Sequence, residues 1–154
     1  MSRDKARRLN LLARLAALKT QSNLADLQTS QQVLQKQQSA CLQLQSYQHE
    51  YLNKHLLDAA EKKPVNVSAL QNKSRFMADL NYAVNVQQQQ LKTAEAIESA
   101  SRSAWSDSYA KEQRWQELEY SARDDENLKQ NKKNDQENLD IWSTRYLGEN
   151  ANKL

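Results

Sequence analysis

Residues that interrupt helices are almost missing from this chain of 154 residues. It has a single glycine, Gly148, and a single proline, Pro64. Because proline and glycine are the strongest helix breakers, there are few places at which a helix must end. We therefore predict an all-α chain that forms one domain over residues 1–154. Its first helix spans about residues 4–61 and its second about 68–147, with a turn at about 62–67.

Apolar and aromatic residues are scarce as well. Hydrophobic residues make up 38% of the chain and aromatic residues 6%, and the mean hydropathy is -0.98. This composition is too polar for a thick globular core. Two paired helices bury only a narrow apolar seam, so the composition favours a coiled coil.

Several other features are missing. No apolar run approaches the roughly 18 residues that cross a membrane. The basic start of the chain is followed too soon by Arg14 to be a signal peptide. The single Cys41 has no internal partner for a disulfide, which fits a reducing cytoplasm. A net charge of +3 does not by itself indicate nucleic acid, so we expect no nucleic-acid partner.

No catalytic, cofactor or metal site is predicted. One glycine does not supply a phosphate-binding loop. On a helix, Cys41 and His49 would lie about 12 Å apart, and further ligands are lacking. His55 is expected to be a seam or surface residue, because no Ser-His-Asp or paired-carboxylate arrangement accompanies it. We expect a chain that is not an enzyme and that holds no cofactor.

The first helix carries a weak heptad register in which leucine alternates with glutamine. Its a and d positions are Ala17, Thr20, Leu24, Leu27, Gln31, Leu34, Gln38, Cys41, Gln45, Gln48, Leu52, His55 and Ala59. Polar residues at such positions favour a defined register at a cost in stability.

A second register follows the proline. The string from Ser68 to Gln71 has the form of a capping box that starts a helix. The predicted seam residues after it are Leu70, Met77, Leu80, Val84, Gln87, Leu91, Ala94, Trp105, Trp115 and Ala122. Folding at the turn places Leu52 near Met77 and brings the N-terminus to about residue 124. The prediction is a long antiparallel two-helix coiled coil with an overhanging C-terminal end of the second helix.

The predicted overhang begins with a very polar stretch, which is a poor isolated helix. Further on, Leu139, Trp142 and Tyr146 recur at i, i+3 and i+7. No other part of the chain is expected to cover this apolar stripe. Two interpretations stay open: a docking face, or a frayed end closed by Gly148.

An aromatic patch is predicted close to the turn. Leu44, Tyr47 and Tyr51 share one helical face beside the predicted seam, and folding brings them near Phe76 and Leu80. Exposed aromatic residues on a helix are typical anchors for protein partners. The alternative is that these residues broaden the core of the hairpin.

The N-terminus is basic and rich in leucine. Its cations are Arg3, Lys5, Arg7, Arg8, Arg14 and Lys19, and its leucines are Leu9, Leu11, Leu12, Leu15 and Leu18. A solvated basic face is the usual explanation. There are more leucines than one partner helix needs, so a second partner, or more weakly a membrane surface, is also an interpretation.

Short motifs resemble a known family. Tyr47-Gln48-His49-Glu50-Tyr51 resembles a Tyr-Gln-x-Glu-Tyr motif of the first helix of the FliJ family, the coiled-coil component of the flagellar type III export apparatus. Phe76 to Leu91, with its run of glutamines, is similar to the start of that family's second helix. Trp105 with Lys111, and the tail string 134–137, match further on. The YscO-like proteins of injectisomes share the shape and are the related alternative.

The resemblance implies a stalk-like adaptor that is cytoplasmic and peripheral at the inner-membrane export apparatus. Its implied partners are the export ATPase hexamer, the cytoplasmic region of the export-gate membrane protein, and substrate chaperones. The implied gate-binding residues are Leu44, Tyr47, Tyr51, Phe76, Leu80 and Ala83. The implied residues of the ATPase-facing end are Arg7, Arg8, Leu11, Leu15, Trp115, Leu139 and Trp142. Gln87 departs from the family pattern, where a histidine is expected.

Two further hypotheses belong to other classes. One is a structural coiled coil that forms homo-oligomers through its aromatic stripes. The other is a helix that binds nucleic acid or a membrane surface through the basic start.

Overall fold

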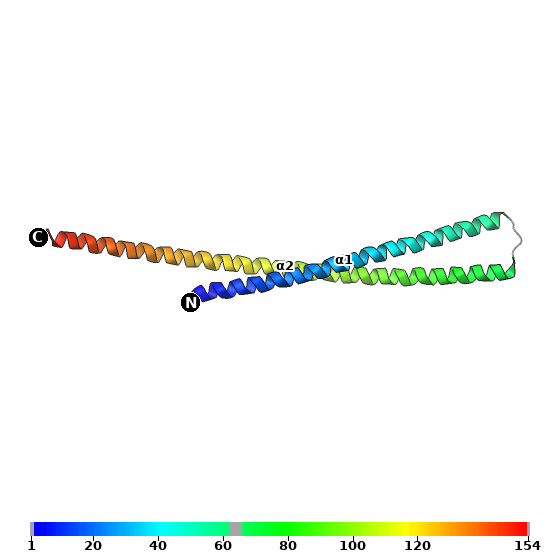
Figure 1. Cartoon of the computed structure of the whole chain (residues 1–154), viewed down its shortest axis with the longest axis horizontal. Helices are drawn as coiled ribbons and strands as arrows, with labels where there is room; N and C mark the ends of the chain where they lie inside the picture. The colour runs from blue at the N-terminus through cyan, green and yellow to red at the C-terminus, as the bar shows by residue number, and fades with distance from the viewer. Residues whose placement is uncertain (1, 62–65, 154) are drawn as a thin grey trace. The chain divides into compact units, whose positions relative to one another are not determined.

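The chain forms two long helices in the computed structural model, which describes residues 2–61 and 66–153. Helix α1 spans Ser2–Ala60 and helix α2 spans Val67–Ala151 (Figure 1). The described residues include no strand. The two helices pack against each other in opposite directions, which confirms the all-α antiparallel hairpin. Most of the predicted turn, including Pro64, lies outside the described residues.

The hairpin divides into two compact units. The turn unit is Ser22–Ser106, and the terminal unit combines Met1–Gln21 with Asp107–Leu154. Each unit takes one stretch of α1 and one stretch of α2, so each contains its own piece of the seam. We describe the two units separately.

The seam of the turn unit follows a strict heptad on both helices. On α2, Met77, Leu80 and the other predicted seam positions are half-buried or buried, and only Leu70 is exposed. On α1, one predicted set, Leu27, Leu34, Cys41 and Gln48, also faces α2. The other predicted set is wrong. Its members Leu24, Gln31, Gln38, Gln45, Leu52 and Ala59 are exposed, as is His55.

The correct second set on α1 lies one residue earlier, at Asn23, Ser30, Gln37, Leu44, Tyr51 and Asp58. Hydrogen bonds explain why polar side chains are accepted there. The Asn23 amide donates to the carbonyl of Ala104 at 3.3 Å, and the Ser30 hydroxyl donates to the carbonyl of Leu27 at 2.8 Å. Each polar group placed in the seam therefore keeps a partner, which removes most of the cost of burying it.

Polar pairs also join the two helices closer to the turn. The Gln87 amide donates to the side-chain carbonyl of Gln37, and the Gln48 amide donates to Asn81 Oδ1 at 2.6 Å. Lys73 Nζ lies 3.4 Å from Asp58 Oδ2, and both residues are half-buried. No large side chain among the described residues is completely buried. The seam is thin, and it specifies register more than it supplies stability.

Helix α2 begins one residue before the predicted start. The Asn66 side chain accepts a hydrogen bond from the Ser68 backbone N–H at 3.1 Å, and the Leu70 N–H donates to the Asn66 carbonyl. This is the geometry of an N-cap at Asn66. The predicted capping box is therefore wrong, because Ser68 already lies inside the helix.

Helix α2 also continues past its predicted end. The helix runs through Gly148 to Ala151. A glycine inside a helix costs about 1 kcal/mol relative to alanine, which weakens a helix without ending it. The expectation that Gly148 closes the second helix is therefore wrong.

In the terminal unit, small residues form the seam. Ala6, Ala13 and Thr20 are buried on α1, and Ser108 is buried on α2. Arg3 Nε lies 3.6 Å from Glu126 Oε1, so α1 begins beside Glu126. Beyond this point every described residue from 127 to 153 is exposed. We call this segment the tail; it is the predicted overhang.

Candidate partner-binding surfaces

Exposed aromatic residues lie close to the turn, where the sequence predicted a patch. The rings of Tyr51 on α1 and Phe76 on α2 are 4.7 Å apart between centroids and inclined by 51°. Phe76 is 51% exposed and Tyr47 is 52% exposed. The two helices therefore bring the predicted aromatic residues together, and two of the rings face solvent.

The other members of the patch contribute to the seam. Leu44, Tyr51, Leu80 and Ala83 are half-buried. Leu44 and Tyr51 occupy heptad positions, so the prediction that they lie beside the seam is wrong. The interpretation that the patch broadens the hairpin core applies to these half-buried members. The half-buried members build the hairpin, and Tyr47 and Phe76 present apolar surface to solvent.

An apolar cleft of about 600 Å³ lies between the helices near the turn. His55 lines it from α1, and Val67, Leu70 and Met77 line it from α2. The sequence prediction placed Leu70 and His55 in the seam. Both side chains are exposed in the structure.

The terminal unit carries a line of exposed leucines, which we call the leucine stripe: Leu11, Leu15 and Leu18. These side chains are 59%, 54% and 62% exposed. Leu15 follows the buried Ala6 by two and a half helical turns at about 3.6 residues per turn, so it lies on the opposite side of α1. The leucine stripe therefore faces away from the seam.

Basic side chains border the leucine stripe on both sides. At helical spacing, Arg7 and Arg14 follow one edge, and Arg8 and Lys19 follow the other. None of these four side chains forms an ion pair within the part of the chain that the structure describes. The stripe is therefore an apolar line between two rows of uncompensated positive charge.

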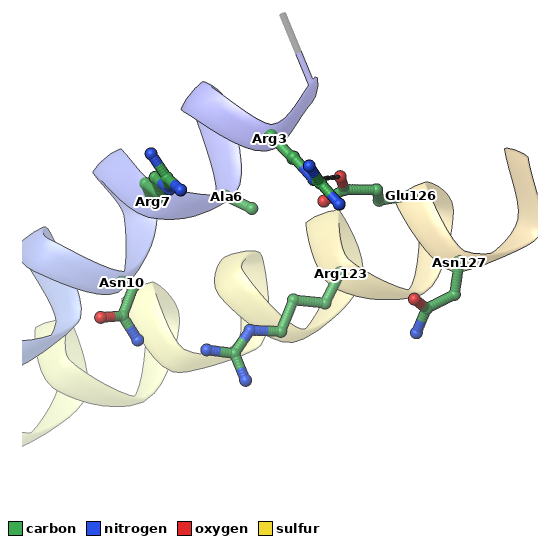
Figure 2. Close-up of a pocket in the computed structure, with 7 residues that line it drawn as sticks. All are labelled: Arg3, Ala6, Arg7, Asn10, Arg123, Glu126 and Asn127. Carbon is green, nitrogen blue, oxygen red and sulfur yellow. Dashed lines mark ion pairs between the residues drawn. The ribbon is translucent and has the colours of Figure 1, made fainter. Parts of the chain in front are cut away.

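A polar cleft of about 450 Å³ adjoins this basic end (Figure 2). Arg3, Ala6, Arg7 and Asn10 line it from α1, and Arg123, Glu126 and Asn127 line it from α2. Guanidinium and amide donors are suited to carboxylate or phosphate groups.

Two carboxylates compensate part of the positive charge at this cleft. Arg3 forms the ion pair with Glu126 that Figure 2 marks. Glu119 Oε1 accepts a hydrogen bond from the Asn10 amide at 2.7 Å and lies 2.7 Å from Arg123 Nη2. Of the three guanidinium groups at this cleft, that of Arg7 forms no ion pair with any described residue.

The tail carries a second exposed stripe, which we call the tail stripe: Leu139, Trp142 and Tyr146. These side chains are 69%, 72% and 68% exposed. The heptad of the α2 seam continues through Lys129, Lys133 and further positions that are all polar except Leu147, and no described helix faces them. Each member of the tail stripe comes one residue before a position of that heptad, which turns the stripe about 100° around the helix from the seam.

The remaining candidate residues behave as ordinary helix residues. Trp115 is half-buried in the seam heptad, and Cys41 is a buried free thiol. The described residues contain no group of histidine, cysteine or acidic side chains that could hold a metal ion. No helix formed by residues 2–61 or 66–153 is long and apolar enough to cross a membrane.

Sequence reasoning missed several exposed aromatic residues. Tyr82 is 72% exposed and Tyr120 is 76% exposed. Both residues fall between the heptad positions of α2. Their place outside the heptad is the signal in the sequence that could have predicted their exposure.

A comparison with protein-family models identifies residues 5–151 as a flagellar FliJ protein. This range covers nearly the whole chain, including both helices and most of the tail. The chain belongs to the FliJ family. No curated protein and no solved structure matches the chain.

Membership of the FliJ family confirms the resemblance seen in the sequence motifs. The FliJ family is a non-enzymatic component of the flagellar export apparatus, so the partners of this chain are proteins of that apparatus. The match is to the flagellar family, which gives the injectisome alternative no support.

Proposed function

We propose that the chain is an adaptor of flagellar type III export that links the export ATPase hexamer to the cytoplasmic region of the export-gate membrane protein. In this role it promotes ATPase activity, escorts substrate chaperones, and acts as a cytoplasmic protein peripheral to the inner membrane. The observation that carries the proposal is that each unit exposes large apolar side chains that its own helix pairing does not use. Exposed apolar lines with charged borders are typical of protein-binding surfaces.

The patch near the turn is the proposed gate-binding surface. Tyr47 and Phe76 supply its exposed rings, and Tyr51 contacts the Phe76 ring from the seam. Leu44, Leu80 and Ala83 are the half-buried members of the surface. Rigid aromatic side chains lose little entropy on binding and often dominate an interface.

The test of the gate surface is a double variant, Tyr47→Ala with Phe76→Ala. We expect affinity for the cytoplasmic region of the gate protein to fall about 30- to 700-fold, because two rings that each contribute about 1–2 kcal/mol together contribute about 2–4 kcal/mol. Helicity by circular dichroism should stay unchanged, since both rings are half exposed. The matched control is Tyr82→Ala, which removes an exposed ring six residues after Phe76 and about 120° around α2. Unchanged affinity in the double variant would contradict the assignment.

The terminal unit is the proposed ATPase-facing end. The residues proposed there are Arg7, Arg8, Leu11, Leu15, Trp115, Leu139 and Trp142. Exposed leucines with cationic borders suit an acidic, partly apolar surface. Trp115 supports this end from the seam, whereas the other six side chains are exposed.

The test of this end measures ATP hydrolysis by the export ATPase with and without the chain. Trp142→Ala combined with Leu11→Ala should reduce the stimulation several-fold, because both side chains are more than half exposed and their loss leaves the seam intact. Deletion of residues 1–14 should have at least the same effect. Tyr120→Ala is the control, since Tyr120 is equally exposed and lies outside the proposed surface. Full stimulation by the double variant would refute this end of the proposal.

A further inference from the structure

Two apolar faces of the terminal unit have no cover among the described residues: the leucine stripe on α1 and the tail stripe on α2. All six side chains are more than half exposed. Both faces have the three-four spacing of a coiled-coil seam, which is wide enough for one further helix each.

The tail stripe does not reach the leucine stripe of its own chain. The Arg3–Glu126 ion pair places the start of α1 beside Glu126. Because α2 continues as an unbroken helix to Ala151, Leu139 lies about 20 Å beyond that point and Tyr146 about 30 Å beyond it. The leucine stripe extends from the same point in the opposite direction. Contact between the two stripes therefore requires two copies of the chain.

The charges beside the two stripes differ. The leucine stripe is bordered by Arg7, Arg8, Arg14 and Lys19, with Asp4 as the single acidic residue of the segment. On α2, the helical positions of Asp135, Glu149 and Lys153 share the face of the tail stripe and Arg145 lies at its edge, whereas Glu137 and Asp140 lie about 130–170° around the helix. A second copy thus offers the carboxylate of Glu149, beside its tail stripe, to an apolar stripe with positive borders.

The spacing selects an antiparallel arrangement. In this direction Leu11, Leu15 and Leu18 oppose Tyr146, Trp142 and Leu139 in turn. The same register sets Arg8 opposite Glu149 and Asp4 opposite Lys153. Arg145 comes nearest to Arg14, and Lys153 lies next to the positions opposite Arg3 and Lys5, so like-charged neighbours also occur.

The parallel arrangement is poorer. When Leu11 opposes Trp142 and Leu15 opposes Tyr146, the next pair sets Leu18 against Glu149. At the other end, Arg8 then opposes Leu139. A charged residue against an apolar one loses hydration without gaining a partner.

We propose that the tail stripe of one copy of this chain docks antiparallel on the leucine stripe of a second copy. In such a dimer, one copy keeps a free tail stripe and the other keeps a free leucine stripe. The contact is therefore head-to-tail, and further copies add as the concentration rises. Four to five helical turns bury less than the roughly 1,200 Å² of a standard stable interface, so the contact is weak and reversible.

This inference goes beyond the proposed adaptor role and does not depend on it. The same side chains belong to the proposed ATPase-facing end, so self-association and ATPase contact compete for one surface. The tests of self-association use the chain alone, without the ATPase. A negative result in either experiment therefore leaves the other intact.

The first test is a mixing experiment with two full-length variants in analytical ultracentrifugation. Leu15→Glu blocks the leucine stripe and keeps the tail, whereas Trp142→Glu blocks the tail and keeps the leucine stripe. We expect the wild-type mass to rise between about 1 µM and 200 µM, and each variant alone to stay monomeric. The 1:1 mixture should stop at a dimer, because only one productive contact remains.

The second test addresses the register and the charges. In a Cys41→Ala background, one copy with Leu18→Cys and another with Leu139→Cys should form a disulfide under mild oxidation, and Leu18→Cys with Tyr146→Cys should form much less. Arg8→Glu or Glu149→Arg alone should weaken self-association, and mixing these two variants should restore it. Circular dichroism should show unchanged helicity for every variant, since all the changed positions except Cys41 are exposed.

Several results would overturn the proposal. A wild-type chain that stays monomeric at about 200 µM excludes it, and the stripes are then left for a foreign helix or a membrane surface. Oligomers that persist in both Leu15→Glu and Trp142→Glu place the contact on another face. A mixture of these two variants that remains monomeric, or equal cross-linking in both cysteine pairs, contradicts the head-to-tail register.

Discussion

Three leucines of α1 in the turn unit provide a graded test of the seam register. Leu27, Leu24 and Leu42 are 6%, 37% and 67% exposed. Leucine to alanine removes about three carbon groups worth about 0.8 kcal/mol each when buried. Scaling by the buried fraction gives losses of unfolding free energy of about 2.3 kcal/mol for Leu27→Ala, 1.5 for Leu24→Ala and 0.8 for Leu42→Ala.

Two further effects sharpen this order. The gain in helix propensity from leucine to alanine is the same at all three sites of one helix, so it cancels from the comparison. The cavity left by the substitution adds to the loss only at the buried Leu27, which widens the gap.

The measurement is urea unfolding followed by circular dichroism at 222 nm, supported by hydrogen exchange of amides around each site. Hydrogen exchange is needed because a long two-helix seam can unfold in stages, so that one global transition does not report each site. The heptad expected from sequence alone places Leu24 and Leu27 equally in the core. A loss for Leu24→Ala that equals or exceeds the loss for Leu27→Ala would refute the register described above.

Three other changes test the polar seam and the helix ends. Gln37→Leu with Gln87→Leu should raise the free energy of unfolding by about 1–2 kcal/mol, because both partners of a half-buried hydrogen bond are replaced by apolar groups. Gln37→Leu alone should lower it, and a double variant less stable than the parent in urea unfolding would contradict this reasoning. Asn66→Ala should lower the free energy of unfolding by about 1 kcal/mol through loss of the α2 N-cap, and Ser68→Ala should lower it by less than about 0.3 kcal/mol. A larger loss for Ser68→Ala than for Asn66→Ala in urea unfolding would favour Ser68 as the N-cap. Gly148→Ala should slow amide exchange in residues 144–151 by about three- to five-fold, because alanine favours the helix over glycine by about 0.8–1.0 kcal/mol. Nothing lies within 4 Å of the added methyl group, so the substitution fits without strain. Unchanged exchange would mean that glycine does not limit helicity there.

Scarcity of glycine and proline was enough to predict two helices, their antiparallel pairing and the overhang. The register of α2 also followed from its sequence, because its apolar residues repeat at the three-four spacing without competition. The sequence of α1 alone does not tell whether Leu24 or Asn23 lies in the seam. It depends on α2, where the carbonyl of Ala104 satisfies the Asn23 amide. The prediction assigned the more apolar residue of each pair to the seam. It was therefore wrong where a hydrogen bond to the other helix stabilises a polar residue in the seam.

The patch near the turn shows the same limit at the level of a site. Sequence spacing correctly grouped Tyr47 and Tyr51 with Phe76. It did not tell which ring faces the neighbouring helix, because a shift of one residue in register turns a side chain about 100° around the helix. Tyr51 entered the seam, and Tyr47 was left exposed. Exposure, and with it the set of residues available to a partner, thus needs the paired structure.

In the terminal unit, small residues of α1 face the seam and larger leucines face outward, which is the reverse of the arrangement that would stabilise the hairpin most. Its seam on α1 is built from Ala6, Ala13 and Thr20, while the larger Leu11 and Leu15 point away from α2. Burial of a leucine stabilises a fold by about 1.5–3 kcal/mol more than its exposure, so pairing with α2 alone does not account for leucines on the outer face. The small residues of α1 fill its side of the seam, and the larger apolar side chains are left on the outside of the pair. The distribution is explained when the outer face meets another helix, which is the common element of the proposed ATPase contact and of the contact between copies.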